Sequence, residues 1–559
     1  MSGIKLFNNV PERFLPPRED WPDYVYAHPE VNWVHYRNSV NAGSEILDVG
    51  IAKHGWGNNI AIYDVDKDES WTYNRLQKEV NRLGNALKKL GVQPGDRVMW
   101  RFGEVPEAAV AELAIWKIGA INVSTALQER ASEIEFIAND TEAVLIICQA
   151  DQVDQIQKAL PNLKTVKHVI SVPESQQDNM LDYRKLLSEA GSELEAYPNL
   201  PGDAAYINYT GGTTGHPKGC IHTHATAVII SDMNCRVVYV LTPQDVTFCV
   251  APIGHGFGNK QKINYPFRFG ASAIYKERPT PKEIWELLIK YKVSIFVAVP
   301  TLYRMMLDSF DPSFRGQINL RLCVCSGEML TKELMDRWNE QVGVKLHNGV
   351  GMVPMAHVFI QSVVNGGKVA PGLSVGKPLP GYEYKLIDEN GYTVKNGEIG
   401  RMAVRGFTGI VYWNNLHPYM PGKQKEDVRE GWCWLDDAYT QDEDGWLYFH
   451  TRLDNMIVTG GRQVAAPEVE EVLSGHPAVN QVAVVGVPDP VRTNSVKAFI
   501  VVNPGYTPSE ELIKELQAYA KENMSVYKYP RIIEFIDDLP RDQVGKIQRR
   551  VLREKSISL

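Results

Sequence analysis

The chain has 559 residues, 44% of them hydrophobic and 23% charged, and a formal net charge of -8. This length exceeds what one hydrophobic core usually organises, so we expect two or more domains. The negative charge argues against nucleic acid as a general partner, and the sequence lacks an apolar run of about 18 residues that could form a membrane helix. Met1 to Asp20 contains no apolar core of a signal peptide, and the seven scattered cysteines show no paired spacing. Composition therefore predicts a soluble, cytoplasmic protein with free thiols and no zinc site.

Predicted helices and strands alternate through the first part of the chain. Apolar residues recur every three or four positions after Trp71, which predicts a helix that ends at Gly91. The segments that follow are predicted to be strand, helix, strand, helix and strand, in the order 97–101, 106–117, 119–123, 132–138 and 143–148. Such alternation indicates layered α/β subdomains.

A glycine- and threonine-rich stretch follows a short apolar strand expected at 204–209. It reads Tyr209-Thr-Gly-Gly-Thr-Thr-Gly-His-Pro-Lys-Gly219. Glycines let a backbone approach a phosphate closely, while hydroxyls, amide groups and a lysine bind its oxygens. The alternative is a solvated glycine-rich turn. The stretch is not the G-x-x-x-x-G-K-[ST] loop, because only two residues separate Gly215 from Lys218.

This stretch resembles the phosphate loop of the adenylate-forming superfamily, which includes acyl-CoA synthetases, luciferases and the adenylation domains of peptide synthetases. Gly211 stands where serine is usual in that loop. The resemblance implies that the loop binds ATP, with Thr213 and Lys218 in catalytic roles. It implies nucleotide-binding roles for Thr210, Gly211, Gly212, Thr214 and Gly215.

Three later motifs resemble further parts of the nucleotide site in this superfamily. An apolar strand at 322–325 leads into an S-G-E turn, which lies against the adenine in the family. A second segment stands where the family has Y-G-x-T-E, and a third resembles W-x-x-T-G-D, whose aspartate accepts the ribose hydroxyls. The resemblance implies nucleotide-binding roles for Ser326, Gly327, Glu328, Asn348, Gly349, Val350, Gly351 and Asp437. Asp437 is preferred to its neighbour Asp436.

The second of these segments departs from the family pattern. Val350 replaces the aromatic residue, Val353 the threonine that meets the α-phosphate, and Pro354 the glutamate that helps to hold magnesium. Either Mg²⁺ is held mainly by ATP phosphates and water, with no protein ligand assigned here, or adenylation is impaired. His357 is a candidate for partial compensation.

The last part of the chain resembles the hinge and the small mobile domain of the superfamily. The resemblance implies that Arg452 contacts the ribose or the phosphates, and that Asp454 is the pivot between domains. Gly460 and Gly461 would approach the pantetheine arm of coenzyme A (CoA). Lys546, in a P-R-x-x-x-G-K-like tail, would reach the substrate carboxylate and the α-phosphate. The alternative for this tail is a basic surface segment.

The predicted fold class is α/β multidomain. A large N-terminal domain over 1–452 is expected to combine layered α/β subdomains with a β-rich subdomain and to hold the ATP and acid sites. A small mobile α+β domain over 453–559 is expected to carry the catalytic lysine. In this domain we expect strands at 481–485 and 496–502, and a helix capped by Thr507.

The resemblance implies an ATP-dependent carboxylate–CoA ligase that uses ATP, Mg²⁺ and CoA, and that forms an acyl adenylate before the thioester. His255, among three glycines, stands where the family walls the carboxylate pocket. The expected substrate is a small carboxylic acid, with a 2-hydroxy acid such as 2-hydroxyisobutyrate preferred and benzoate or 2-aminobenzoate as alternatives. An adenylation module that loads a carrier protein and a non-catalytic nucleotide-binding relative remain open. We expect no nucleic-acid or membrane partner, and a homodimer is allowed.

Overall fold

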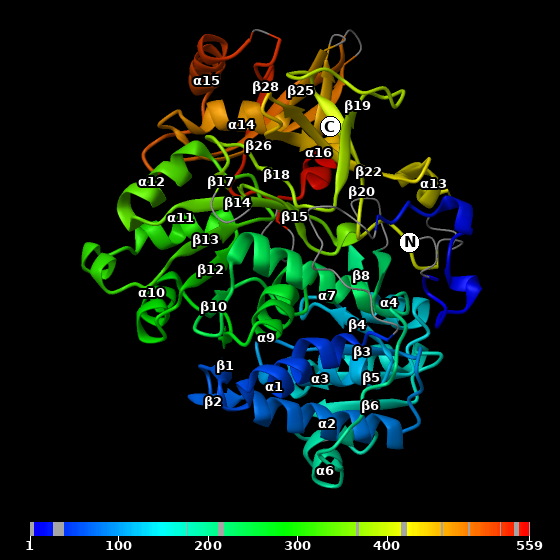
Figure 1. Ribbon diagram of the computed structural model, residues 1–559. Coiled ribbons are helices and arrows are strands. Elements are labelled where there is room, and N and C mark those ends of the chain that lie inside the picture. The colour runs from blue at the N-terminus through cyan, green and yellow to red at the C-terminus, as the bar shows by residue number, and fades with distance from the viewer. Residues whose placement is uncertain are drawn as a thin grey trace. The chain divides into compact units, whose positions relative to one another are not determined.

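The computed structural model describes residues 5–25, 39–175, 177–210, 217–364, 368–414, 422–459, 462–489, 492–525, 527–541 and 547–557. The chain forms two compact units (Figure 1). Unit 1 comprises Met1–Glu383 and Val404–Cys433, and unit 2 comprises Tyr384–Ala403 and Trp434–Leu559. Among the described residues, no helix has both the length and the apolar character that crossing a membrane requires.

Unit 1 contains a seven-stranded sheet with the strand order β7-β6-β5-β3-β4-β8-β9. The strands are β3 (Arg97–Arg101), β4 (Ile121–Thr125), β5 (Leu145–Gln149), β6 (His168–Val172), β7 (Leu181–Asp182), β8 (Ala204–Thr210) and β9 (Lys218–Thr223). All neighbouring strands are parallel except β8 and β9, which form an antiparallel pair. Every residue of β3 and β4 is buried, as expected for strands covered on both faces.

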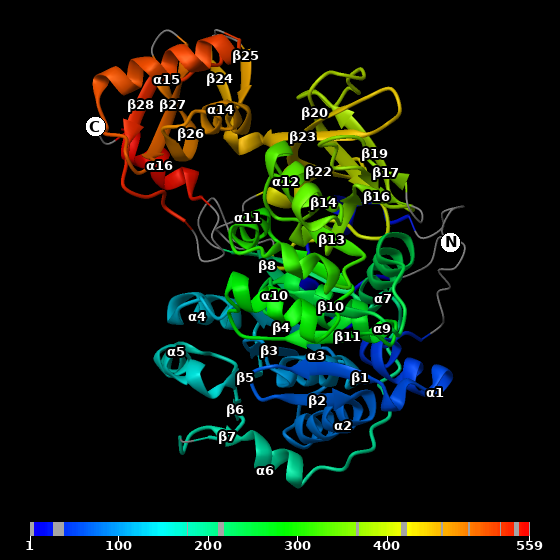
Figure 2. The same ribbon diagram turned by 90° about the vertical axis from the view of Figure 1, so that its left-hand side faces the viewer.

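Helices cover both faces of this sheet. The helices α2 (Tyr73–Lys89), α3 (Pro106–Lys117) and α6 (Tyr183–Ser188) pack into the core on one face. The helices α4 (Ala131–Asp140) and α5 (Val153–Ala159) pack into a separate core on the other face, and Figure 2 shows them together beside strands β3 to β6. The predicted strand 97–101 and helix 106–117 are confirmed, and the strand predicted at 119–123 lies two residues later.

A second sheet of unit 1 has nine strands in the order β18-β15-β14-β13-β12-β10-β11-β1-β2. Its strands are β1 (Ile60–Asp64), β2 (Glu69–Thr72), β10 (Val246–Cys249), β11 (Ser272–Tyr275), β12 (Ile295–Ala298), β13 (Leu322–Cys325), β14 (Leu346–Gly351), β15 (Val358–Gln361) and β18 (Lys377–Pro378). The helices α10 (Pro281–Lys290), α11 (Pro300–Asp308) and α12 (Lys332–Val342) share a core with one face, in which the rings of Trp285 and Trp338 stack at 5.6 Å.

One continuous core joins the inner faces of the two sheets. It contains side chains of α2 and α3, of β3 and β8, and of β1 and β11, so these elements pack around the same buried volume. The helices α1 (Val49–His54), α7 (His224–Met233) and α9 (Tyr265–Arg268) add side chains to this core, and the short helix α8 (Gly256–Asn259) precedes α9 in the chain. Three π-helical segments adjoin these helices: η3 (Ser44–Asp48), η7 (Asn234–Tyr239) and η8 (Lys260–Asn264). Such segments are rare and often mark functional sites.

A five-stranded sheet follows, with β19 (Glu383–Ile387), β20 (Gly400–Arg405), β21 (Val428–Arg429), β22 (Trp432–Gln441) and β23 (Leu447–Arg452). The strands β16 (Val363–Val364) and β17 (Lys368–Val369) pair separately, and α13 (Lys423–Asp427) precedes β21. This part accounts for the predicted β-rich subdomain.

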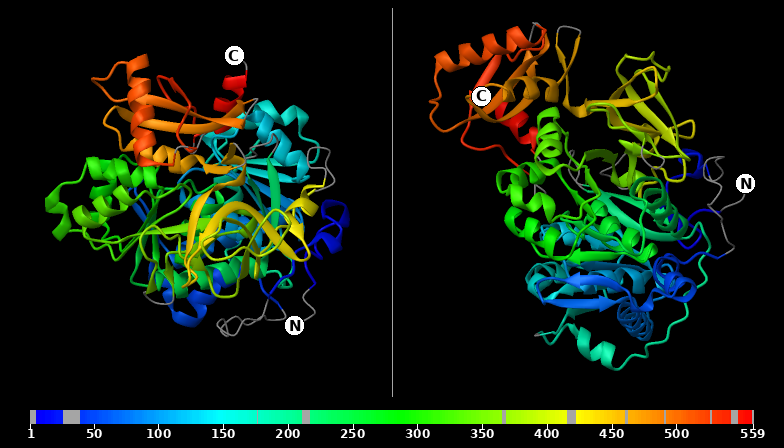
Figure 3. Two further views of the ribbon diagram at one scale, coloured as in Figure 1. Left: turned by 90° about the horizontal axis from the view of Figure 1, so that it is seen from above. Right: turned by 60° about the vertical axis from the view of Figure 1, so that its left-hand side comes forward.

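The C-terminal part of unit 2 has a sheet of five strands, β24 (Met456–Thr459), β25 (Arg462–Ala465), β26 (Val479–Asp489), β27 (Thr493–Val502) and β28 (Ile532–Phe535). The helices α14 (Ala466–Ser474) and α15 (Glu510–Asn523) share its core, and α16 (Arg549–Ile557) ends the chain (Figure 3). The prediction that Thr507 caps α15 is wrong. Ser509 is the cap, because its hydroxyl accepts the N–H of Leu512 at 3.2 Å.

Candidate active site

Two of the predicted nucleotide-binding segments lie at the carboxyl ends of adjacent parallel strands. β13 ends at Cys325, which is in register with Asn348 of β14, so the turn Ser326-Gly327 lies next to the last part of β14. Gly327 has a φ of +91°, a left-handed conformation that favours glycine. Carboxyl ends of strands in open α/β sheets are the usual position of nucleotide sites. The structure therefore brings together two motifs that are about 20 residues apart in sequence.

Glu328, a predicted nucleotide-site residue, makes a contact within the protein that the sequence did not reveal. Its Oε2 accepts hydrogen bonds from the N–H of Thr301, at 3.0 Å, and from the Thr301 hydroxyl, at 2.7 Å. Thr301 lies in the first turn of α11, where a carboxylate satisfies N–H groups that lack a partner within the helix. Glu328 thus connects the turn after β13 to the start of a neighbouring helix.

The glycines of β14 allow a tight antiparallel pairing with β15. A Cβ on Gly349 would lie 2.5 Å from a Val358 methyl group, and one on Gly351 would lie 2.7 Å from the carbonyl oxygen of His357. These approaches exclude larger side chains unless the strands separate. The following residues Val353–Met355 form a 3-10 turn, in which Val353 and Pro354 are half-buried. The carbonyl of Val353 accepts a hydrogen bond from Nε2 of the buried His222, at 3.1 Å.

His357, the candidate for compensation, is committed to a buried hydrogen-bond chain. Its Nδ1 accepts from the Asn234 amide at 2.8 Å, and its Nε2 donates to the Tyr382 hydroxyl at 2.7 Å. The Tyr382 hydroxyl in turn pairs with the Thr408 hydroxyl at 2.8 Å. Burial lowers the pKa of His357 to about 3, so the ring is neutral. Both ring nitrogens are therefore used within the protein.

The predicted phosphate loop is held by an antiparallel pair of strands. Thr210, the last residue of β8, is in register with Lys218, the first residue of β9. The turn between them, which includes Gly211, Gly212, Thr213, Thr214 and Gly215, lies outside the described residues. His255 is exposed and caps α8, where its Nδ1 accepts the N–H of Phe257 at 3.3 Å. His255 thus starts the short helix that runs into the π-helix η8.

In unit 2, β22 and β23 place two predicted residues opposite each other. Asp437 of β22 is in register with Arg452 of β23, and the carboxylate of Asp437 is buried and accepts from the Tyr439 hydroxyl at 3.3 Å. The neighbouring Asp436 is half-exposed and forms ion pairs with Arg401 at 3.0 Å and with Arg452 at 3.9 Å. The two neighbouring carboxylates therefore differ in burial and in partners, and Arg452 lies near both.

Of the other predicted residues of unit 2, only Asp454 belongs to the described part of the chain. Asp454 belongs to a short 3-10 segment, Leu453–Asn455, directly after β23. Gly460 and Gly461 lie outside the described residues, in the connection between the paired strands β24 and β25. Lys546 also lies outside them, next to Ile547, which forms a β-bridge with Arg541.

Comparison with known proteins assigns the chain to a family. Residues 51–410 match the model of the AMP-binding enzyme, and residues 468–546 match the AMP-binding enzyme C-terminal domain. The chain belongs to the AMP-binding enzyme family. It is 33% identical to benzoate–CoA ligase of Thauera aromatica, over 92% of this chain and 95% of the relative. It is 30% identical to 3-hydroxybenzoate–CoA ligase of Aromatoleum sp. (strain CIB), over 92% and 97%.

A solved structure extends this relationship to three dimensions. The anthranilate CoA ligase AuaEII in complex with anthranoyl-AMP is 32% identical and superposes with a TM-score of 0.84, over 93% of this chain and 98% of that one. The two matching family domains and these relatives confirm the predicted superfamily and fold class. The AMP-binding enzyme described here is accordingly an AMP-forming acid–thiol ligase, a class that uses ATP, Mg²⁺ and CoA.

The protein side chains near the predicted nucleotide site fit a magnesium ion that binds together with ATP and takes most of its ligands from the phosphates and water. Among the described residues, no group of three or more His, Cys, Asp or Glu side chains could hold a metal ion. Pro354 offers no oxygen at the position of the usual glutamate side chain. Mg²⁺ tolerates a shell made mostly of phosphate and water oxygens.

A polar cluster in the core was missed by the sequence analysis. Lys260, Glu112, Asn122 and Asn259 are all buried between α3, β4 and the start of η8. The run Asn259-Lys-Gln-Lys-Ile-Asn264 would ordinarily be interpreted as a solvent-exposed helix, because five of its six residues are amides or lysines. The cluster is recognised only in the structure, where Asn259 and Lys260 contact Glu112 and Trp116 of α3.

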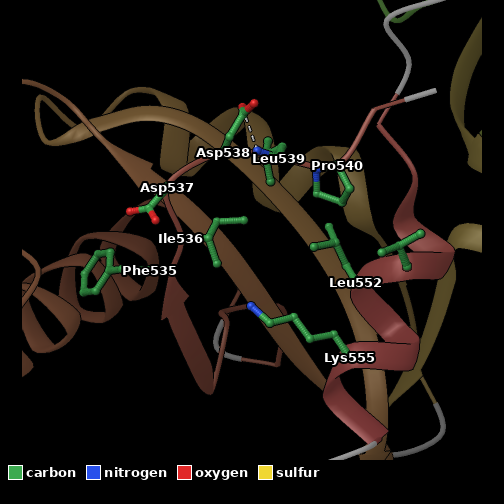
Figure 4. A pocket seen from close by; sticks show the side chains of 9 residues that line it. Phe535, Ile536, Asp537, Asp538, Leu539, Pro540, Leu552 and Lys555 are labelled. Carbon is green, nitrogen blue, oxygen red and sulfur yellow. Dashed lines mark hydrogen bonds between the residues drawn. The ribbon is translucent and has the colours of Figure 1, made fainter. Parts of the chain in front are cut away.

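A surface hollow of about 530 Å³ lies in unit 2, between the segment after β28 and α16 (Figure 4). Asp537, Asp538 and Lys555 are its charged lining residues, and Lys555 pairs with Glu534 at 2.8 Å. None of the residues predicted to bind nucleotide, acid or CoA lines this hollow.

Proposed function

We propose that this ligase activates a small carboxylic acid with ATP and then transfers the acyl group to CoA. In the first half-reaction a carboxylate oxygen attacks the α-phosphorus of ATP and pyrophosphate leaves. In the second, the CoA thiol loses its proton and attacks the acyl carbon, and AMP leaves. The observation that carries the proposal is the juxtaposition of the Ser326–Gly327 turn with Asn348–Gly351 at the carboxyl ends of β13 and β14. The family match over both parts of the chain supports it.

The residues of the predicted phosphate loop and Lys546 are proposed to neutralise the negative charge of the ATP phosphates during the reaction. Thr210, Thr213, Thr214 and Lys218 donate to phosphate oxygens, and the glycines of the loop let backbone N–H groups do the same. Lys546 binds the carboxylate and the α-phosphate in the first half-reaction. Mg²⁺, when bound, supplies further neutralisation of the phosphates. No covalent enzyme intermediate is required, and the seven cysteines are all buried and unoxidised, so none is assigned a role.

The ribose and CoA roles are assigned to unit 2. Asp437 accepts the ribose hydroxyls, and Arg452, its partner across the strand pair, contacts the ribose or a phosphate. Gly460 and Gly461 approach the pantetheine arm. We place the mobile domain at 453–559 with Asp454 as its pivot, so that Lys546 acts in adenylation and Gly460 in thioester formation. An Asp454→Pro variant with full activity in both half-reactions would count against this division.

The acid is the finer part of the proposal. The relatives named above act on benzoate, 3-hydroxybenzoate and anthranilate, and they favour an aromatic acid. These relatives give no support to 2-hydroxyisobutyrate. We keep it as the aliphatic candidate among the acids to be assayed. His255 is proposed to wall the carboxylate pocket. The free cysteines agree with a cytoplasmic location, where thiols stay reduced. The proposed homodimer is tested by size-exclusion chromatography with light scattering.

The test is AMP formation from ATP across a panel of benzoate, 3-hydroxybenzoate, 2-aminobenzoate, 2-hydroxyisobutyrate and propionate, with and without CoA. CoA-dependent AMP release with one acid supports the proposal. Pyrophosphate release that does not respond to CoA identifies a module that loads a carrier protein. ATP binding without pyrophosphate release for any acid identifies a non-catalytic relative and refutes the proposal.

A further inference from the structure

The π-helix η8 buries polar side chains to an unusual degree. Its exposed fractions are 3% for Lys260, 5% for Gln261, 2% for Lys262 and 0% for Asn264. Two of these side chains have strong partners. Lys262 forms an ion pair with Glu104, and Gln261 donates to the Tyr239 hydroxyl at 2.8 Å. The other two side chains, Lys260 and Asn264, lack such partners. Neither the amide nitrogen nor the amide oxygen of Asn264 has a hydrogen-bond partner within the described residues.

Lys260 is a buried cation that lacks an ion-pair partner. Its ammonium donates to Oδ1 of Asn259 at 2.9 Å and lies 4.0 Å from the centre of the Tyr206 ring. In the part of the chain that the structure describes, it forms no ion pair, although Glu112 acts on it electrostatically from a greater distance. An ammonium group has three donors, and burying one that is poorly paired is costly. One hydrogen bond and the faces of two aromatic rings, Tyr206 and the more distant Trp116 at 5.9 Å, compensate only in part for this burial.

Three buried polar atoms of this cluster lack a hydrogen-bond partner among the described residues. Oε2 of Glu112 accepts from the amides of Asn122, at 3.1 Å, and Asn259. Its other oxygen, Oε1, has no hydrogen-bond partner among the described residues, and neither has Oδ1 of Asn122 or the hydroxyl of Tyr206. Buried polar atoms in native proteins are nearly always satisfied by protein, water or ligand. The cluster therefore offers unused donors and unused acceptors to a third group.

The cluster is connected to the proposed reaction site. Lys260 directly follows α8, which His255 caps, and the N–H of Asn259 donates to the carbonyl of His255 at 2.9 Å. On its other side, the Tyr206 ring lies 5.0 Å from that of His222, whose Nε2 donates to the carbonyl of Val353. Val353 occupies the position at which the family contacts the α-phosphate. Lys260 is thus linked to the acid-pocket candidate through α8, and to the phosphate-site candidate through the rings of Tyr206 and His222.

We propose that Lys260 and Glu112 are specificity-determining residues that select acids carrying a hydroxyl group in addition to the carboxylate. A hydroxyl is both donor and acceptor, so it can accept from the Lys260 ammonium and donate to Oε1 of Glu112. An acid with hydrogen or methyl at that position would leave both groups buried and unpaired. The inference rests on the proposed acid ligase function, and it names the chemical class of its substrate.

The test compares acids that differ by one hydroxyl group. The pairs are 3-hydroxybenzoate with benzoate, and 2-hydroxyisobutyrate with isobutyrate, each assayed for CoA-dependent AMP formation. Sites built to bond a substrate hydroxyl reject the analogue that lacks it strongly, so we expect wild-type kcat/KM to favour one hydroxy acid by ~100-fold or more. In Lys260→Met this ratio should fall towards one, mainly through KM, while Lys260→Arg should keep most of it.

The control is Lys117→Met. Lys117 is equally buried on α3 but pairs with Asp48 at 2.8 Å, so its removal should lower stability and leave the ratio unchanged. A wild-type ratio near one for both pairs overturns the proposal, whether or not any variant folds. An unchanged ratio in a folded Lys260→Met does the same. In either case AMP formation still shows a ligase, whereas no turnover of any acid by wild type rejects the proposed function itself.

Discussion

The choice of Asp437 over Asp436 as the ribose acceptor can be tested with matched substitutions. The two carboxylates are adjacent on β22 and differ in burial. We consider Asp437→Asn and Asp436→Asn, which remove the charge and keep the shape. Asp437 is buried, and its Oδ2 accepts a hydrogen bond from the Tyr439 hydroxyl at 3.3 Å. Asp436 is 42% exposed and forms ion pairs with two arginines.

The expected magnitudes differ because of burial. A hydrogen bond to a charged group contributes about 1.5–3 kcal/mol, and the amide can still accept one hydroxyl but not two. Loss of one such bond in Asp437→Asn should therefore reduce kcat/KM for ATP by ~10- to 150-fold. Exposed ion pairs contribute about 0–1 kcal/mol, so Asp436→Asn should change the same constant by less than ~5-fold.

The assay is steady-state AMP formation at varied ATP, repeated with 2′-deoxy-ATP. If Asp437 accepts the ribose hydroxyls, wild type should discriminate against 2′-deoxy-ATP, and Asp437→Asn should lose most of that discrimination. Asp436→Asn should keep it and so controls for the loss of one carboxylate on this strand. Equal effects of the two substitutions, or full discrimination in Asp437→Asn, would refute the assignment of the ribose site to the buried face of β22.

Three further predictions concern stability and the nucleotide site. Burial lowers the pKa to about 3 or 4 in four histidines, which are His222, His224, His347 and His357. Their unfolded pKa is about 6.5, so their neutral state contributes stability above that pH which is lost as pH falls. Burial raises the pKa of Glu129 to about 7 and also raises the pKa of Glu104 and Glu112, so these carboxyl groups act in the opposite direction. Urea unfolding should therefore show a stability that falls below pH 6 by at most ~4 kcal/mol per pH unit, and a flat profile would contradict this. Glu470→Ala removes the carboxylate that binds Arg549 at 2.7 and 2.8 Å and that accepts the N–H of Val484 at 2.7 Å. The free energy of unfolding should fall by about 3 kcal/mol, which would be measured as a lower melting temperature. An unchanged melting temperature would argue against a stabilising ion pair. Gly351→Ala should reduce ATP turnover and cost about 1–3 kcal/mol, because the new Cβ meets backbone at 2.7 Å, whereas Gly316→Ala, with open space around it, should have neither effect.

The sequence alone determined the local elements and the order of the motifs. Trp71 to Gly91 carries a complete helical apolar pattern, and its helix appears at Tyr73–Lys89 with Thr72 as the cap. The strand Arg97–Arg101 and the helix Pro106–Lys117 are likewise encoded by apolar runs and by a proline at the first helical position. The glycine-rich loop and the motifs after it identified the superfamily, because each needs particular residues within a few positions of one another.

Only the tertiary structure decided which polar groups meet. His357 and Asn234 are 123 residues apart, and Glu112 and Asn259 are 147 apart, so no local pattern could pair them. The cap of Thr301 by Glu328 and the register of Asp437 with Arg452 also depend on how separate strands and helices pack. Lys260 shows the physical reason most clearly. A run of polar residues favours solvent in isolation, and it is the packing of η8 against α3 and β8 that removes this lysine from water and leaves its charge to be used.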